Sequence, residues 1–168
     1  MKKLLSFLVC GLFFASPAFA GGECYSSAEL RAEQLLRLHS ELMVITVTCR
    51  QGSQGENLVP AYTGFTHTNI NVLHDAEQTM MNYYSNTHGG DGIEQLDSLR
   101  TRLGNESGQE IADMSAPVYC SKYRDKVLSF YQGDSTQIVS EVQRMVVAEK
   151  SYGHLCPSSG TRIAKGGQ

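Results

Sequence analysis

Apolar residues between Ser26 and Cys49 recur every three or four positions, which is the spacing of one side of an α-helix. Ser26 followed by Glu29 has the sequence of a capping box, so we predict a helix from Ser27 to Thr48. Two adjacent stripes form its apolar side: Leu35, Leu38, Leu42 and Ile45, then Ala32, Leu36, Met43 and Val47. A side this wide contacts two neighbours at once, so we expect this helix at the centre of a bundle. The opposite side carries Glu33, Gln34, Arg37, Ser40 and Glu41.

The helical period returns in four later segments, which we predict as helices. They cover about Pro60–Asn86, Ile93–Met114, Ser115–Tyr131 and Asp134–Gly153. Gly104 and Gly108 weaken the second of these, each by about 1 kcal/mol relative to alanine, so we expect it to bend or split near Gly104 and Asn105. No segment has the period of a strand, an internal repeat or a run of coiled-coil heptads. The pattern therefore predicts an all-α bundle of four to five helices.

The first twenty residues have the pattern of a cleaved secretory signal peptide. Lys2 and Lys3 precede the apolar run Leu4–Phe14, and an A-x-A site ends at Ala20. This run is shorter than the roughly 20 residues that span a bilayer, and no later segment approaches that length. We expect residues 1–20 to be removed, residues 21–156 to form a single helical domain, and the polar residues 157–168 to form a flexible tail.

Removing 20 of the 168 residues leaves 148, with 12 Lys and Arg side chains against 17 Asp and Glu, a formal charge of −5. Such a mildly acidic chain argues against nucleic acid or an anionic membrane as its partner. We predict a periplasmic or secreted protein with no membrane span and no nucleic-acid partner. We expect a protein partner or client.

The cysteines that remain after cleavage predict two disulfides. Cys10 leaves with the signal peptide, and Cys24, Cys49, Cys120 and Cys156 stay. An even number of cysteines in an exported chain is typical of a disulfide framework. No C-x-x-C pair is present to suggest a redox motif or a haem site. The spacing does not suit zinc.

The predicted length of the first helix restricts how these cysteines pair. At about 1.5 Å per residue, Cys24 and Cys49 lie more than roughly 30 Å apart, whereas bonded cysteines have Cα atoms within about 7 Å. Each must therefore pair with Cys120 or Cys156. Antiparallel packing of consecutive helices favours Cys49 with Cys120 and Cys24 with Cys156. The second bond requires the last helix to cross the bundle or the tail to fold back, so Cys24–Cys120 with Cys49–Cys156 remains the alternative.

His39 lies among leucines, about nine residues before the end of the first helix. Asn69 lies about nine residues after the start of the second, also on an apolar side. Antiparallel packing would place the two in one layer, where a buried polar group needs a partner. We expect a hydrogen bond between His39 and Asn69. Such a pair either fixes the register of the helices or gives His39 a role in ligand binding or proton transfer.

His67 and His74 share one side of the second predicted helix but lie seven residues apart, roughly 10 Å along its axis. They are too far apart to chelate one metal ion unaided. We expect both to be solvated and to titrate between about pH 5 and 8, which makes them candidates for an acid-dependent change of the surface.

No motif in the chain indicates catalysis. E-x-x-H, H-E-x-x-H and G-x-S-x-G are all absent, so we predict no catalytic residue, no metal site and no cofactor. Paired carboxylates can converge from distant positions without any motif. Glu106 and Ser107 lie beside two glycines and would form a site only where a helix break exposes backbone, so we favour an irregular helix there.

These observations favour a binding or interaction protein over an enzyme. An exported helical chain with few disulfides also has the architecture of acid-stress chaperones, an analogy of architecture alone. The alternatives are a subunit of an envelope or secretion assembly, which would co-purify with a partner, and an enzyme acting on cell-wall or small-molecule substrates. An enzyme of that kind requires a deep polar cleft with converging acids or histidines.

Overall fold

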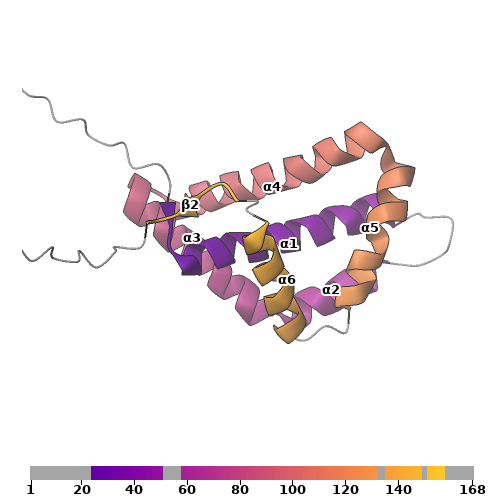
Figure 1. The fold of residues 1–168 in the computed structure, drawn as a ribbon, viewed down its shortest axis with the longest axis horizontal. Helices are drawn as coiled ribbons and strands as arrows, with labels where there is room; N and C mark the ends of the chain where they lie inside the picture. The colour runs from indigo at the N-terminus through magenta and orange to yellow at the C-terminus, as the bar shows by residue number, and fades with distance from the viewer. Residues whose placement is uncertain (1–23, 51–57, 132–134, 149–150, 158–168) are drawn as a thin grey trace, which may run out of the picture.

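The computed structural model describes residues 24–50, 58–131, 135–148 and 151–157. The predicted signal peptide and residues 158–168 of the predicted tail lie outside this part. Six helices are present in it: α1 (Ser27–Cys49), α2 (Leu58–Thr68), α3 (Ile70–His88), α4 (Gly92–Met114), α5 (Ala116–Phe130) and α6 (Ser135–Val147). The all-α, disulfide-stapled bundle predicted from the sequence is confirmed (Figure 1).

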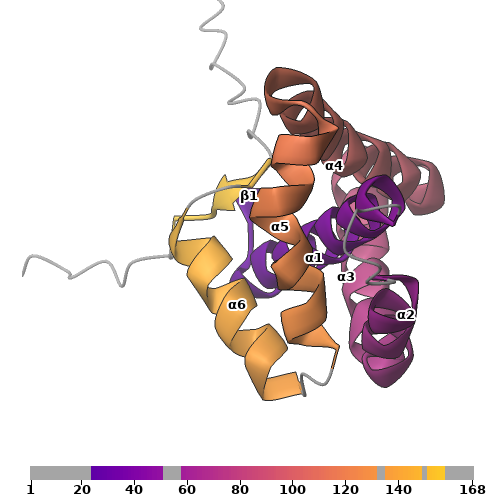
Figure 2. The ribbon, with the colours of Figure 1, turned by 90° about the vertical axis from the view of Figure 1, so that its right-hand side faces the viewer.

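Helix α1 begins where the sequence predicts and lies at the centre of the bundle. Ser26 accepts a hydrogen bond from the backbone N–H of Glu29, whose side chain accepts one from the backbone of Ser26. The apolar side chains Leu38, Leu42 and Ile45 are fully buried. Viewed nearly along its axis, α1 lies between α4, the α2 and α3 pair, and the α5 and α6 pair (Figure 2).

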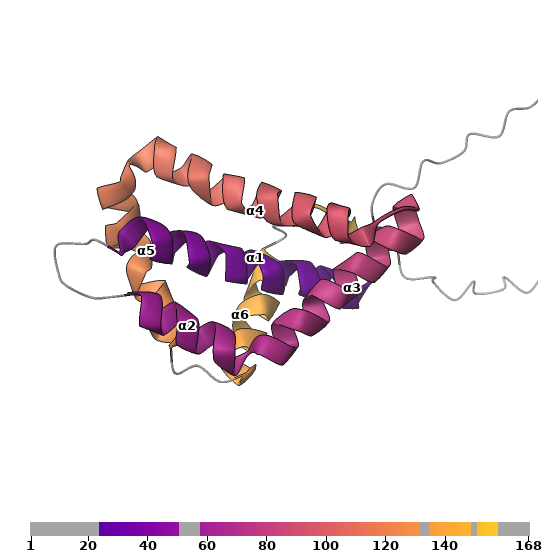
Figure 3. The same ribbon diagram turned by 180° about the vertical axis from the view of Figure 1, so that it is seen from behind.

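The second predicted helix is two helices, so the prediction of one continuous helix over Pro60–Asn86 is wrong. Asn69 separates α2 from α3, and its backbone leaves the helical region at φ −111° and ψ 16°. Its buried side chain donates to the Phe65 carbonyl at 2.8 Å, and the same oxygen accepts the backbone N–H of Asn69 at 3.1 Å. The chain bends there, and α2 and α3 together form a V beside α1 (Figure 3).

Helix α4 is continuous from Gly92 to Met114, so the predicted split near Gly104 and Asn105 does not occur. It lies alongside α1 and runs in the same direction (Figure 3). Helices α5 and α6 instead cross α1 at a steep angle (Figure 1). No helix within the described residues is long and apolar enough to cross a membrane.

The polar side of α1 is buried, although the sequence offered no neighbour for it. Glu33 and Gln34 have no exposed surface, and Arg37 and Ser40 are less than a tenth exposed. Helices α4 and α6 and the segment after α6 cover this side. The charged side of the central helix is therefore enclosed together with its leucines, whereas Met43 and Val47 of the predicted second stripe are exposed.

Both ends of α1 are tied to the C-terminal half of the chain. Cys49 is bonded to Cys120 on α5, and Cys24 to Cys156, the two pairs that the sequence favoured. The crossing of α6 brings the chain back to the start of α1. There β1 (Cys24–Tyr25) and β2 (His154–Leu155) form a two-stranded parallel ladder.

Candidate functional site

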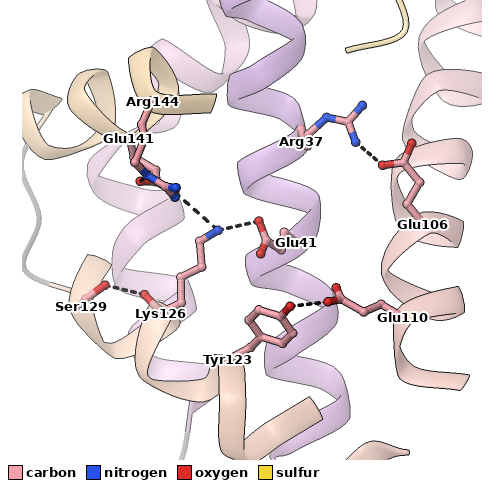
Figure 4. A network of polar contacts seen from close by, with 9 residues as sticks. All are labelled: Arg37, Glu41, Glu106, Glu110, Tyr123, Lys126, Ser129, Glu141 and Arg144. Carbon is pink, nitrogen blue, oxygen red and sulfur yellow. Dashed lines mark hydrogen bonds and ion pairs between the residues drawn. The ribbon is translucent and has the colours of Figure 1, made fainter. Parts of the chain in front are cut away.

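Seven charged side chains line a cleft of about 440 Å³. Helix α4 forms one wall, α5 and α6 form the opposite wall, and α1 forms the floor (Figure 4). We call it the mixed-charge cleft. Its charged lining residues are Arg37, Glu41, Glu106, Glu110, Asp113, Lys126 and Arg144.

The α4 wall is acidic. Glu106, Glu110 and Asp113 follow one another at intervals of four and three residues, which places them on one side of the helix. Glu106 accepts a hydrogen bond from Arg37, and Glu110 accepts one from the hydroxyl of Tyr123. Asp113 accepts from the side-chain amide of Gln109 at 2.8 Å. This acidic row is about 10 Å long, because an α-helix rises about 1.5 Å per residue.

The opposite wall carries two cations. The ammonium of Lys126 on α5 lies 2.7 Å from a carboxylate oxygen of Glu41 and 3.6 Å from one of Glu141. The guanidinium of Arg144 on α6 binds Glu141 through two of its nitrogens. These hydrogen bonds from Arg144 and the nearby charge of Lys126 lower the pKa of Glu141 below its ordinary value, against the opposing effect of burial.

Arg37 fixes the floor of the cleft. Its guanidinium pairs with Glu33, one helical turn earlier, and with Glu106 across the cleft. The buried carboxylate of Glu33 also accepts the backbone N–H of Tyr152, at 3.0 and 3.1 Å from its two oxygens. The ring of Tyr152 lies 5.2 Å from the guanidinium carbon of Arg37 and 4.4 Å from that of Arg102. Burial and the adjacent Glu106 raise the pKa of Tyr152 to about 12.

The three histidines named from the sequence line a second groove, of about 430 Å³. His39 comes from α1, His67 from α2 and His74 from α3, and Glu77 joins them. The groove lies beside the break at Asn69, and the bend of the chain there brings α2 and α3 to the same opening. The sequence prediction measured the separation of His67 and His74 along one straight helix. That measure does not apply across the bend between α2 and α3.

The predicted bond between His39 and Asn69 is not formed. The Nε2 of His39 lies 2.7 Å from the hydroxyl of Tyr62 instead, and Asn69 donates to its own helix. Asn69 lies at the junction of α2 and α3 and not inside one long helix, so the packing that was expected to place it beside His39 does not apply. Burial lowers the pKa of His39, an effect that Glu77 partly opposes.

The sequence did not identify the mixed-charge cleft. It singled out Glu106 only in connection with a helix break, and it left Glu33, Arg37 and Glu41 on an unassigned polar side. Charged residues at helical spacing are typical of solvated helix faces, and their partners here lie up to 119 residues away. No group of three or more metal-binding side chains is arranged to hold a metal ion in the residues that the structure describes.

No protein-family model, curated protein or solved structure matches this chain, so its function has to be inferred from the geometry of the cleft.

Proposed function

We propose that this protein is an exported binding protein that holds a ligand or partner in the mixed-charge cleft. The two disulfides support an oxidising compartment, where such bonds form and persist. The signal-peptide pattern of residues 1–20 supports the same location.

The observation that carries the proposal is the fixed arrangement of opposite charges around a cavity. Ion pairs hold Arg37 between Glu33 and Glu106 and hold Lys126 against Glu41, so these groups need little reorganisation when a ligand enters. Glu106 and Glu110 stay close to half exposed at the opening. Complementary charges of this kind give a binding site its specificity and speed association.

Backbone NMR of the mature chain tests the proposal. Residues 21–168, labelled with ¹⁵N, would be titrated with the low-molecular-mass fraction of an envelope extract. We expect amide shifts to concentrate on the parts of α1, α4, α5 and α6 around the cleft, and to disappear in Lys126→Met but not in the exposed control Arg31→Gln. Shifts that fall elsewhere, or that survive in Lys126→Met, would contradict a ligand site in this cleft.

An enzyme acting on cell-wall or small-molecule substrates is the second candidate. Glu41, Glu106 and Glu110 converge on one cleft, as such an enzyme requires. Each of them already accepts from a donor, namely Lys126, Arg37 and Tyr123 respectively, which favours binding. Release of soluble fragments from purified cell wall, abolished by both Glu106→Gln and Glu110→Gln, would replace the binding proposal with catalysis.

A further inference from the structure

We propose that the mixed-charge cleft binds short peptides or amino acids in their zwitterionic form. Their ammonium group would lie against the acidic row of α4, and their carboxylate against Lys126 and Arg144. This inference rests on the proposed binding function and adds the chemical class of the ligand.

The first argument is the opposite sign of the two walls. Glu106, Glu110 and Asp113 lie on α4, whereas Lys126 and Arg144 lie across the cleft on α5 and α6. Glu41 and Glu141 balance part of the charge of Lys126 and Arg144, so a carboxylate is attracted there by the donors that these two cations keep, and an ammonium is attracted by the acidic row of α4. A ligand with both charges at its two ends is attracted by both walls, and the geometry fixes its direction.

The second argument is the hydrogen-bonding capacity left on each wall. An ionised carboxylate accepts several hydrogen bonds, and Asp113 has only the amide of Gln109 as a partner among the described residues. Glu110 accepts from the phenol of Tyr123, and its nearest cation, Lys122, is 3.5 Å away. On the opposite wall, Arg144 uses two nitrogens on Glu141 and keeps further N–H groups. Acceptors therefore remain on α4 and donors on α6.

The third argument is access. The side chain of Arg144 is 68% exposed and that of Glu110 is 41% exposed, so both can reach a ligand without disturbing the core. Lys126 is mostly buried and fixed by Glu41 and Glu141, so it supplies a positive charge that cannot move away. The ammonium of Lys122 lies 4.5 Å from the ring of Tyr123 and 3.5 Å from Glu110. The side chain of Lys122 is 55% exposed, so the ammonium of a ligand can take its place beside Glu110.

Isothermal titration calorimetry with four forms of trialanine tests the inference. The forms are the free tripeptide, its N-acetylated form, its C-amidated form and the form with both ends blocked. At low ionic strength we expect blocking either end to weaken binding by at least about tenfold, and blocking both to abolish it, because each charged hydrogen bond is lost with its group.

Two variants assign the ends of the peptide to the two walls. Glu110→Gln should weaken the two forms with a free amine and leave the N-acetylated form unchanged. Arg144→Gln should weaken the two forms with a free carboxylate and leave the C-amidated form unchanged. Asp75→Asn and Arg31→Gln, which remove exposed charges outside the cleft, should bind all forms like the wild type.

Equal binding of blocked and free peptides, the reverse assignment of the two variants, or no binding of any form would overturn the inference. The NMR titration distinguishes such a failure from failure of the proposed function. If the extract still shifts the cleft amides, the ligand class is wrong and the binding function stands. If it does not, both are wrong.

Discussion

Replacing Glu33 by glutamine removes the charge at a fully enclosed position of α1. Its carboxylate has no exposed surface and is bound by Arg37 and by the backbone N–H of Tyr152. Glutamine keeps the volume but presents an N–H₂ group to donors on both sides. Breaking a buried ion pair on one side costs about 3–5 kcal/mol, because the remaining charge stays buried without its partner. That is a large part of the roughly 5–15 kcal/mol by which a domain is stable.

Urea unfolding followed by circular dichroism measures this change, with Asp97→Asn as the matched control. Asp97 pairs with Arg100 on the exposed side of α4, where both side chains are more than two fifths exposed, and its loss should cost about 1 kcal/mol or less. Hydrogen exchange adds a local readout, since the amide of Tyr152 should exchange faster in Glu33→Gln. If the two variants lose equal stability and the Tyr152 amide stays protected, the polar side of α1 does not hold the C-terminal segment in place.

Three further results are expected. Burial lowers the pKa of His39, so this residue binds a proton more readily in the unfolded chain than in the folded protein. The free energy of unfolding, measured in urea, should therefore fall as the pH drops below about 6.5. The fall should be less steep in His39→Gln. Gly92→Ala would place a Cβ 2.4 Å from a carbonyl oxygen of α3 and should cost about 1–3 kcal/mol in a thermal melt, whereas Gly104→Ala meets no atom within 4 Å and should stabilise by up to about 1 kcal/mol. Replacing Cys49 and Cys120 by alanine opens a loop between residues 71 positions apart and should cost about 4 kcal/mol in urea unfolding; a loss below about 1 kcal/mol would contradict the constraint.

The outline of the bundle was predictable because periodicity and capping are local signals. The start of α1 follows from Ser26 and Glu29, and its buried leucines follow from their spacing. The break at Asn69 was not predictable in this way. The apolar residues before it and after it keep the same helical phase, so the pattern predicts one helix across the break.

The mixed-charge cleft was not predictable, because its contacts join positions far apart in the chain. Glu33, Arg37 and Glu41 look like a solvated face until Glu106, Lys126 and the backbone of Tyr152 are placed beside them. A single sequence does not contain that information. The histidines show the same limit, since their shared groove depends on a bend that no residue pattern indicated.

The closure of α1 by the last described residues has a consequence for how the protein is made. A ribosome delivers Glu33 119 residues before Tyr152, so the charged side of the innermost helix is covered only after that long segment has been made. Contacts of such long sequence separation slow folding. A nascent chain stalled before Ser151 would leave the charged side of its central helix uncovered and open to proteases. We therefore expect such a shortened chain to be degraded rather than to persist as a folded protein.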